Sequence, residues 1–154
     1  MDQTQKIMLT REGLAELKKE HGNLVNVKRP EAVSRLAVAR GQGDLAENSE
    51  YTAAKQDLAF IDGRIAELEL VLHEATVVVS HSKKKIDVGC KVTLHISGKK
   101  EIFTIVGEWE ADPLQKKISH FSPLGKALLG KKVGEKVEVE APAGKITYKI
   151  LNID

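Results

Sequence analysis

The sequence predicts an α+β protein, in which a long antiparallel coiled-coil hairpin of α-helices precedes a small antiparallel β-sheet domain with one short helix. Three observations lead to this prediction. A heptad stripe of apolar residues runs through the middle of the chain, a similar stripe precedes it and ends in glycines, and apolar residues alternate with polar ones beyond about residue 76. We expect the hairpin to span residues 1–78 and the β-sheet domain to span residues 79–154.

The first helical segment begins after Thr10, a residue type that caps helix N-termini. Pro30 interrupts its apolar pattern, because proline lacks an N–H group and its ring clashes with the preceding turn. We therefore expect a kink or short break at residues 26–30. The stripe before the break contains Leu14, Leu17, His21 and Leu24, and the face after it contains Ala32, Val33, Leu36, Ala37 and Arg40.

The second helical segment carries an apolar seam whose spacing alternates between three and four residues. Its members are Tyr51, Ala54, Leu58, Ile61, Ile65, Leu68, Leu72 and Ala75. About 27 residues at roughly 1.5 Å each give a helix of roughly 40 Å. So narrow a stripe needs a partner helix to bury it. The upstream segment is that partner, and Gly41 and Gly43 allow the chain to reverse, which places residues 41–50 at the tip.

The C-terminal half shows the period of two that is typical of β-strands. The apolar positions are in 76–79, at Val92, Leu94 and Ile96, in 101–106, at Val137 and Val139, and at Ile146, Tyr148 and Ile150. Ser97-Gly98 and the segment 141–144 are turn signals between them. Pro123 begins a short helical segment that we expect to cover the sheet.

The composition excludes several classes of function. The 154 residues include 24 basic and 22 acidic side chains, a net charge of +2, which argues against binding nucleic acid through bulk charge. Cys90 is the only cysteine, so the sequence predicts neither an internal disulfide nor a cysteine-based zinc site. No apolar run approaches the roughly 20 residues that span a bilayer. The N-terminus also lacks the apolar stretch of a signal peptide, so we expect a cytoplasmic protein.

Two carboxylates at the tip, Asp44 and Glu47, have two interpretations. The pattern Asp44-Leu-Ala-Glu47 fits a capping box, in which both acids serve a helix N-terminus. Alternatively, the two acids hold a divalent cation such as Mg²⁺, which prefers oxygen ligands. Two carboxylates are too few to build a metal site alone, so a second macromolecule would have to supply further oxygens.

The run from Arg40 to Tyr51, RGQGDLAENSEY, resembles the tip of the bacterial Gre transcript-cleavage factors, and in particular their GreA-like branch. The resemblance extends over nearly the whole chain. It includes Leu9-Thr10, Arg29-Pro30, Ala53-Ala54-Lys55, Glu110-Ala-Asp112, Ile118-Ser119, the segment SPLGKALLGK at 122–131, and Gly134.

This resemblance implies an accessory factor that works with RNA polymerase and is no enzyme itself. The β-sheet domain would have an FKBP-like fold and dock at the rim of the polymerase's secondary channel, and the coiled coil would enter the channel. Asp44 and Glu47 match the acids that hold a Mg²⁺ ion jointly with the polymerase, so that a backtracked complex cleaves its RNA 3′ end. Asn48, Ser49 and Tyr51 would shape the tip.

Two further sets of residues follow from the resemblance. Arg40 and Lys55 match a small basic spot that would contact the nascent RNA 3′ end, and so sparse a spot favours short extruded RNAs. The polymerase-docking set comprises Asp112, Ser119, Ser122, Pro123 and Leu124. We expect a monomer without membrane association. A channel-blocking inhibitor on the same scaffold, or a plain interaction module with the acids as helix caps, remains the alternative.

Overall fold

The computed structural model describes residues 6–43, 48–78 and 82–154, and it divides the chain into two compact units. The hairpin unit is Ala15–Glu74, and the β unit combines the chain up to Leu14 with Ala75–Asp154. The sequence had instead predicted a boundary between residues 78 and 79, with every earlier residue in the hairpin. The two divisions differ because a strand before the hairpin pairs with a strand after it.

That pairing joins β1 (Met8–Leu9) to β2 (Thr76–Val77) in a parallel two-stranded sheet. Met8 lies opposite Thr76 and Leu9 lies opposite Val77. Backbone hydrogen bonds extend the contact, from the Thr76 N–H to the Ile7 carbonyl (2.8 Å) and from the Val78 N–H to the Leu9 carbonyl (2.8 Å). The chain therefore enters and leaves the hairpin at neighbouring points of the β unit.

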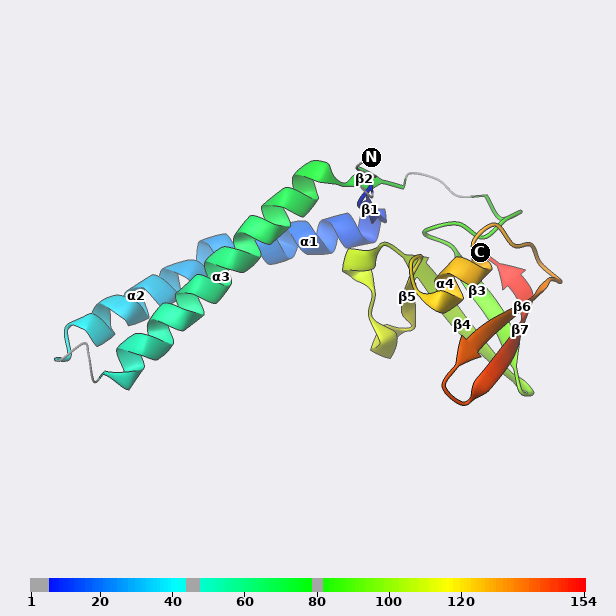
Figure 1. The fold of residues 1–154 in the computed structure, drawn as a ribbon. Helices are drawn as coiled ribbons and strands as arrows, with labels where there is room; N and C mark the ends of the chain where they lie inside the picture. Colours follow the sequence, from blue (N-terminus) through cyan, green and yellow to red (C-terminus); the bar gives the residue numbers. More distant parts are fainter. Residues whose placement is uncertain (1–5, 44–47, 79–81) are drawn as a thin grey trace, which may run out of the picture. The chain divides into compact units, whose positions relative to one another are not determined.

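The predicted helical hairpin is confirmed. Its helices are α1 (Arg11–Asn23), α2 (Arg29–Arg40) and α3 (Ser49–Glu74), and α3 runs antiparallel to the other two (Figure 1). A π-helical segment, η1 (Leu24–Lys28), joins α1 to α2. Among residues 6–43, 48–78 and 82–154, no helix is both long and apolar enough to cross a membrane.

The π-helical segment replaces the break that the sequence predicted at residues 26–30. Pro30 lies in the first turn of α2, so its missing N–H group and its ring have to be accommodated by the turn before it. There the Arg29 N–H group donates to the Leu24 carbonyl, five residues earlier, which is the wider π-type spacing. The helix therefore passes through the proline site without ending.

Seven residues of the predicted seam lie in α3, Ala75 directly follows the helix, and none of the eight is exposed. Ala54 and Leu68 are the most deeply buried, at 1% and 0% exposure. The face predicted for α2 is partly wrong. Ala32 and Ala39 are buried and Leu36 is half-buried. Val33, Ala37 and Arg40, each one position and thus about 100° further round the helix, are exposed.

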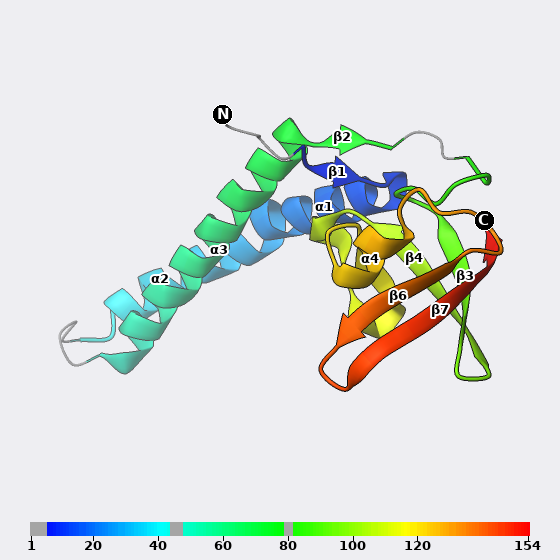
Figure 2. The same ribbon diagram turned by 45° about the vertical axis from the view of Figure 1, so that its right-hand side comes forward.

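The β unit contains a five-stranded sheet in the order β5-β4-β3-β7-β6, of which Figure 2 labels β4, β3, β7 and β6. Its strands are β3 (Lys91–Ile96), β4 (Lys99–Val106), β5 (Lys117–Ser119), β6 (Lys136–Ala141) and β7 (Gly144–Ile153). All neighbours are antiparallel except β4 and β5, which are parallel. Two short 3₁₀ helices, η2 (Glu108–Glu110) and η3 (Pro113–Gln115), form the connection that permits this parallel pair.

The core of the β unit lies between the sheet and the predicted short helix, α4 (Pro123–Leu128). Leu128 of α4 is fully buried among strand residues, and Leu124 and Leu129 pack against the same cluster. The fully buried members at or below 2% exposure are Ile86, Val88, Cys90, Val92, Leu94, Ile105, Leu128 and Ile150. These contacts fix the position of the segment before α4.

Glu110 fixes the start of α1 to the β unit. Its carboxylate accepts hydrogen bonds from the Thr10 N–H group (2.8 Å) and from the Thr10 hydroxyl. The Thr10 hydroxyl oxygen in turn accepts from the Gly13 N–H group (3.1 Å), the bond of a helix N-cap. Thr10 therefore caps α1, as the sequence predicted, and the cap is itself held by the half-buried carboxylate of Glu110 from η2.

Candidate functional site

The tip of the hairpin begins where α2 ends. The Gly41 N–H group donates to the carbonyls of Ala37 (3.3 Å) and Val38 (3.2 Å), so Gly41 closes the last turn. Gly43 then has φ = +129°, a conformation that a residue with a side chain rarely adopts. Asp44 and Glu47, the predicted metal-holding acids, lie outside the described residues, and their role stays a prediction.

Asn48 joins the two sides of the tip through the two ends of its side-chain amide. The Nδ2 group donates to the Ala39 carbonyl in the last turn of α2 (2.8 Å). The Oδ1 atom accepts from the Tyr51 N–H group in the first turn of α3 (3.0 Å). Asn48 is thus the N-cap of α3 and a tether to α2, and it fixes where the segment between Gly43 and Asn48 begins and ends.

This geometry bears on the capping interpretation of the two acids. The helix after the tip starts at Ser49, and the N-cap position is occupied by Asn48. Asp44 precedes that cap by four positions in the sequence, so it does not hold the N-cap position of α3. The capping box predicted for Asp44 and Glu47 therefore does not account for the start of α3.

The two basic residues assigned to RNA contact lie on different helices of the hairpin. Arg40 is the last residue of α2 and is exposed, whereas Lys55 is exposed in α3. The Lys55 Nζ atom lies 5.5 Å from the centroid of the Tyr51 ring, within the range of a cation–π contact. Tyr51, in the first turn of α3, thus contacts the ammonium group of Lys55 in the next turn.

Arg64 of α3 has a structural role. Its guanidinium group donates to both carboxylate oxygens of Glu20 in α1, at 2.7 and 3.1 Å, and to Glu67 at 3.0 Å. These bonds join α1 to α3 near the base of the hairpin.

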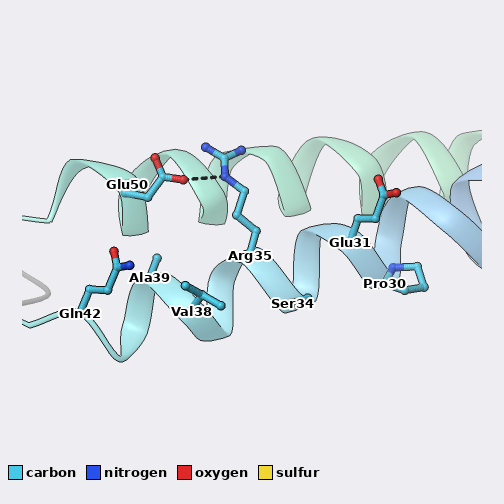
Figure 3. A pocket seen from close by; sticks show the side chains of 8 residues that line it. All are labelled: Pro30, Glu31, Ser34, Arg35, Val38, Ala39, Gln42 and Glu50. Atoms are coloured by element: carbon cyan, nitrogen blue, oxygen red, sulfur yellow. Dashed lines mark hydrogen bonds and ion pairs between the residues drawn. The ribbon is translucent and has the colours of Figure 1, made fainter.

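An ion-pair network lies beside the tip, in an open groove of about 770 Å³ (Figure 3). Arg35 of α2 reaches across to α3, where its Nε atom is 2.6 Å from Glu50 and its Nη1 atom is 2.5 Å from Asp57. The hydrogen bond from Arg35, and next its positive charge, hold the pKa of Glu50 below its ordinary value. The hydrogen bonds to Glu50 and Asp57 raise the pKa of Arg35 in turn.

Sequence reasoning missed this network. The charges of Arg35, Glu50 and Asp57 look like ordinary solvated positions on separate helices. Glu50 and Asp57 are seven residues apart on one helix, the spacing that returns a side chain to nearly the same face. That spacing is the only feature of the sequence that points to the network. It identifies Arg35 as the shared partner only when the register of α2 against α3 is known.

The residues assigned to polymerase docking form one border of the β unit. Ser119, Ser122, Pro123 and Leu124 follow one another from the end of β5 into α4. Asp112 is drawn to the same border by backbone hydrogen bonds with Lys117 (2.9 and 3.0 Å), just before Ser119. The structure therefore brings the five residues of this set into one region. Their role in docking stays a prediction.

Two of these residues, Asp112 and Ser122, have local structural tasks. Asp112 accepts a hydrogen bond from the Leu114 N–H group (3.0 Å) and caps η3. The Ser122 hydroxyl donates to the Ser119 carbonyl (2.7 Å) and accepts from the Gly125 N–H group (3.0 Å), which caps α4. Pro123 is exposed. Leu114, which the sequence analysis did not single out, is 96% exposed on the turn that Asp112 caps.

Comparisons with known proteins agree over both units. A family model described as "Transcription elongation factor, N-terminal" matches residues 7–77. A second, described as "Transcription elongation factor, GreA/GreB, C-term", matches residues 81–154. The two models together account for nearly all of the chain.

Individual relatives resemble the chain over the same extent. The transcription elongation factor GreA of Thermoanaerobacter pseudethanolicus is 50% identical over 151 residues, which cover 96% of each chain. The GreA of Lactococcus lactis is 47% identical over 150 residues, covering 95% of this chain and 96% of the relative. Among solved structures, GreA factor homolog 1 (Gfh1) of Thermus thermophilus is 32% identical, with a TM-score of 0.47 over 97% of this chain and 99% of that one.

Proposed function

The chain belongs to the GreA/GreB family of transcription elongation factors, and from this premise we propose that it stimulates the intrinsic, Mg²⁺-dependent cleavage of the RNA 3′ end by a backtracked bacterial RNA polymerase. The observation that supports this proposal best is the hairpin itself. Its helices converge on a short segment that carries two carboxylates between Gly43 and Asn48. Such an arm can carry acids into the channel of a larger enzyme.

The donor set at the tip suits a shared ion. Asp44 and Glu47 offer carboxylate oxygens, the ligand type that Mg²⁺ prefers, but they are too few to enclose an ion. They would therefore complete a coordination shell to which the polymerase contributes the remaining oxygens. Such an ion, when bound, activates water and stabilises the leaving oxygen of a phosphodiester. This chain would contribute the placement of the two acids. Asn48 supports that placement because it joins α2 to the start of α3, on either side of the acids.

The other assigned residues would contact the extruded RNA and the polymerase. Arg40 and Lys55 would bind phosphates of the extruded RNA, and with so few cations the short extruded fragments would be preferred. The border from Asp112 to Leu124 would dock at the rim of the polymerase's secondary channel. The factor would act as a cytoplasmic monomer and leave the bond-breaking chemistry to the polymerase.

The deciding experiment measures RNA 3′-end cleavage in a stalled, backtracked elongation complex with Mg²⁺, with and without this protein. We expect short 3′ fragments to be released. Asp44→Ala or Glu47→Ala should abolish this stimulation, because each removes a ligand of the shared ion, while polymerase binding persists. Gln42→Ala, also beside the tip but without a carboxylate, is the matched control and should retain cleavage.

The same assay tests the alternative function. A channel-blocking regulator would bind polymerase and slow nucleotide addition without releasing RNA fragments. Normal cleavage by both acid variants would refute the assignment of Asp44 and Glu47. Binding without any cleavage by the unmodified protein would instead favour the regulator.

A further inference from the structure

In the distal half of the hairpin the fully buried residues are alanines, and the larger apolar residues Leu36, Leu58 and Ile61 are only half-buried. The buried residues of α2 are Ala32 and Ala39, and the buried residue of α3 in that half is Ala54. Near the base, Leu17, Leu68 and Val71 are buried instead. Alanine removes little surface from water and interlocks poorly with its neighbours, so an alanine seam resists axial sliding less than a leucine seam.

Arg35 makes a contact that depends strongly on axial position. Glu50 and Asp57 are separated by seven residues, about 10 Å along the axis of α3. The guanidinium group bonds both, from Nε to Glu50 (2.6 Å), as Figure 3 shows, and from Nη1 to Asp57 (2.5 Å). A shift of α3 by one turn in either direction would lengthen one of these bonds beyond hydrogen-bonding distance. Two opposed bonds from one rigid planar group therefore define a register.

The location of this contact links it to the tip. Glu50 is the second residue of α3, two positions after Asn48, and Arg35 lies about one turn before Ala39, the residue whose carbonyl Asn48 binds. Both contacts therefore join the C-terminal part of α2 to the start of α3. What fixes the register of α2 against α3 here also fixes the separation of Gly43 and Asn48, between which the acids lie.

We propose that Arg35, bridging Glu50 and Asp57, sets the register of the distal hairpin and is a positioning residue for cleavage stimulation. This proposal rests on the proposed function for its consequence, but its structural part stands independently of polymerase. Exposed ion pairs contribute little to stability, and Arg35, Glu50 and Asp57 are 45%, 51% and 56% exposed. Removing Arg35 should therefore alter geometry and leave the hairpin folded.

The test uses the full-length chain with spin labels on cysteines introduced at the exposed positions Ala37 and Gln56, one on each helix. Cys90 is buried and should remain unlabelled. We expect Arg35→Ala to broaden the distribution of label distances. Arg35→Lys, which keeps the charge but lacks the planar fork, should broaden it as well. The exchanged pair Arg35→Glu with Glu50→Arg should restore the narrow distribution in part.

The functional measurement separates positioning from binding. In the backtracked-complex assay we expect Arg35→Ala to lower the maximal cleavage rate on the order of tenfold, as expected for small displacements of reacting groups. The factor concentration for half-maximal effect should stay unchanged, and the exchanged pair should recover activity. The matched control is Arg29→Ala, which removes an ion pair between the same helices, to Asp62 at 2.7 Å, but with one carboxylate only. It should change neither measurement.

Each outcome decides the proposal. An unchanged distance distribution in Arg35→Ala overturns the register role, and a broadened distribution with full cleavage overturns the positioning role. A rise in the half-maximal concentration at unchanged maximal rate also overturns it, because it would indicate a binding residue. If the unmodified protein stimulates no cleavage, the proposed function fails, and the label distances alone decide whether Arg35 sets the register.

Discussion

Asn48 shows how one side chain can shape the tip, since the two ends of its amide serve different helices. The Oδ1 atom caps α3 at the Tyr51 N–H group, and the Nδ2 group binds the Ala39 carbonyl of α2. A carboxylate or hydroxyl at the same position could serve as a cap but could not donate in the same way. The amide is thus the side chain type that meets both requirements.

Substitution of Asn48 should separate the two functions. We expect Asn48→Ala to destabilise the first turn of α3 by about 1 kcal/mol, the usual cost of a lost N-cap. Asn48→Asp should retain the cap and lose only the tether to α2. Hydrogen exchange of the Tyr51 amide is the measurement, with Ser49→Ala as control. Fast exchange in Asn48→Ala and near-normal exchange in Asn48→Asp is the expected result, and equal exchange in both would contradict it.

The ion pair of Arg35 with Glu50 makes this part of the hairpin sensitive to acid. Arg35 lowers the pKa of Glu50, chiefly through its hydrogen bond and then through its charge. A carboxyl group with a lower pKa in the folded state stabilises that state above its unfolded pKa, and the contribution is lost as pH falls through the folded pKa. The contact should therefore weaken as pH falls through the folded-state pKa of Glu50, which lies below the ordinary value of a glutamate.

A titration of the Glu50 carboxyl carbon by NMR would check this prediction. Arg35→Ala should move the midpoint upward, toward the ordinary value of a glutamate, because both the hydrogen bond and the attracting charge are removed. Arg29→Ala should leave the midpoint in place, since its partner is Asp62. An unmoved midpoint in Arg35→Ala would show that the pair is absent in solution.

At the residue scale, the sequence predicted well where a motif is local. Thr10 caps α1 as expected, because a cap and its helix are adjacent in the chain. The Arg35 network was missed, because it joins residues 15 and 22 positions apart that no single-helix pattern connects. The roles of Asp44 and Glu47 stay predictions, since these residues lie outside the described part of the chain.

At the scale of elements, α1 shows how one residue type can have opposite effects at two positions of a helix. A Cβ atom built on Gly13 would lie 2.0 Å from the Glu110 carboxylate, which hydrogen bonds to Thr10 hold in place. A Cβ atom on Gly22 would have no neighbour within 4 Å among the described residues. Close approach of η2 therefore requires glycine at the first position, and nothing in this structure requires it at the second.

The paired substitutions should therefore differ in sign. Gly22→Ala should stabilise the protein by about 1 kcal/mol, the difference in helix propensity. Gly13→Ala should destabilise it by about 1–3 kcal/mol, the usual cost of overpacking. Urea unfolding followed by circular dichroism is the measurement. Adding Glu110→Ala should reduce the cost of Gly13→Ala, and a stabilising Gly13→Ala would refute the contact.

Predictability at this scale depended on the length of the pattern. The predicted seam repeats over eight positions, seven of them in α3, so its phase is well determined, and none of the eight is exposed. In α2 the pattern covers only 12 residues and includes several alanines, which are compatible with either face, so Val33, Ala37 and Arg40 were misplaced. Strands β1 and β2 have two residues each and are too short to show alternation.

At the scale of the whole molecule, the two units do not correspond to the two halves of the sequence. Leu9 precedes the hairpin yet is fully buried in the β unit, where its carbonyl accepts from the Val78 N–H group. Leu17, only eight residues later, is buried in the hairpin unit at 6% exposure. No composition shift marks this transition, because it falls within α1. For this reason the sequence predicted a boundary at residue 78 and missed the one near residue 14.

Truncating each leucine should locate its unit. Leu9→Ala should cost about 2–5 kcal/mol, as is usual for a buried leucine, and should reduce hydrogen-exchange protection in the β unit. Leu17→Ala should reduce protection in the hairpin. Amides of Val78 and Ala54 report on the two units respectively. Loss of hairpin protection alone in Leu9→Ala would contradict the assignment of the N-terminal segment to the β unit.

The parallel pairing of β1 with β2 has a consequence for how the length of the hairpin can change. Strands paired in this way are about 5 Å apart, so the excursion from Leu9 to Thr76 starts and finishes at almost the same place. Topologically, the arm is an insert within a host domain, comparable to a loop of unusual length. Whole heptads could be added to or removed from both helices together while the host keeps its strand order. The length of the hairpin can therefore change, in evolution or by design, without a change in how it is attached to the β unit.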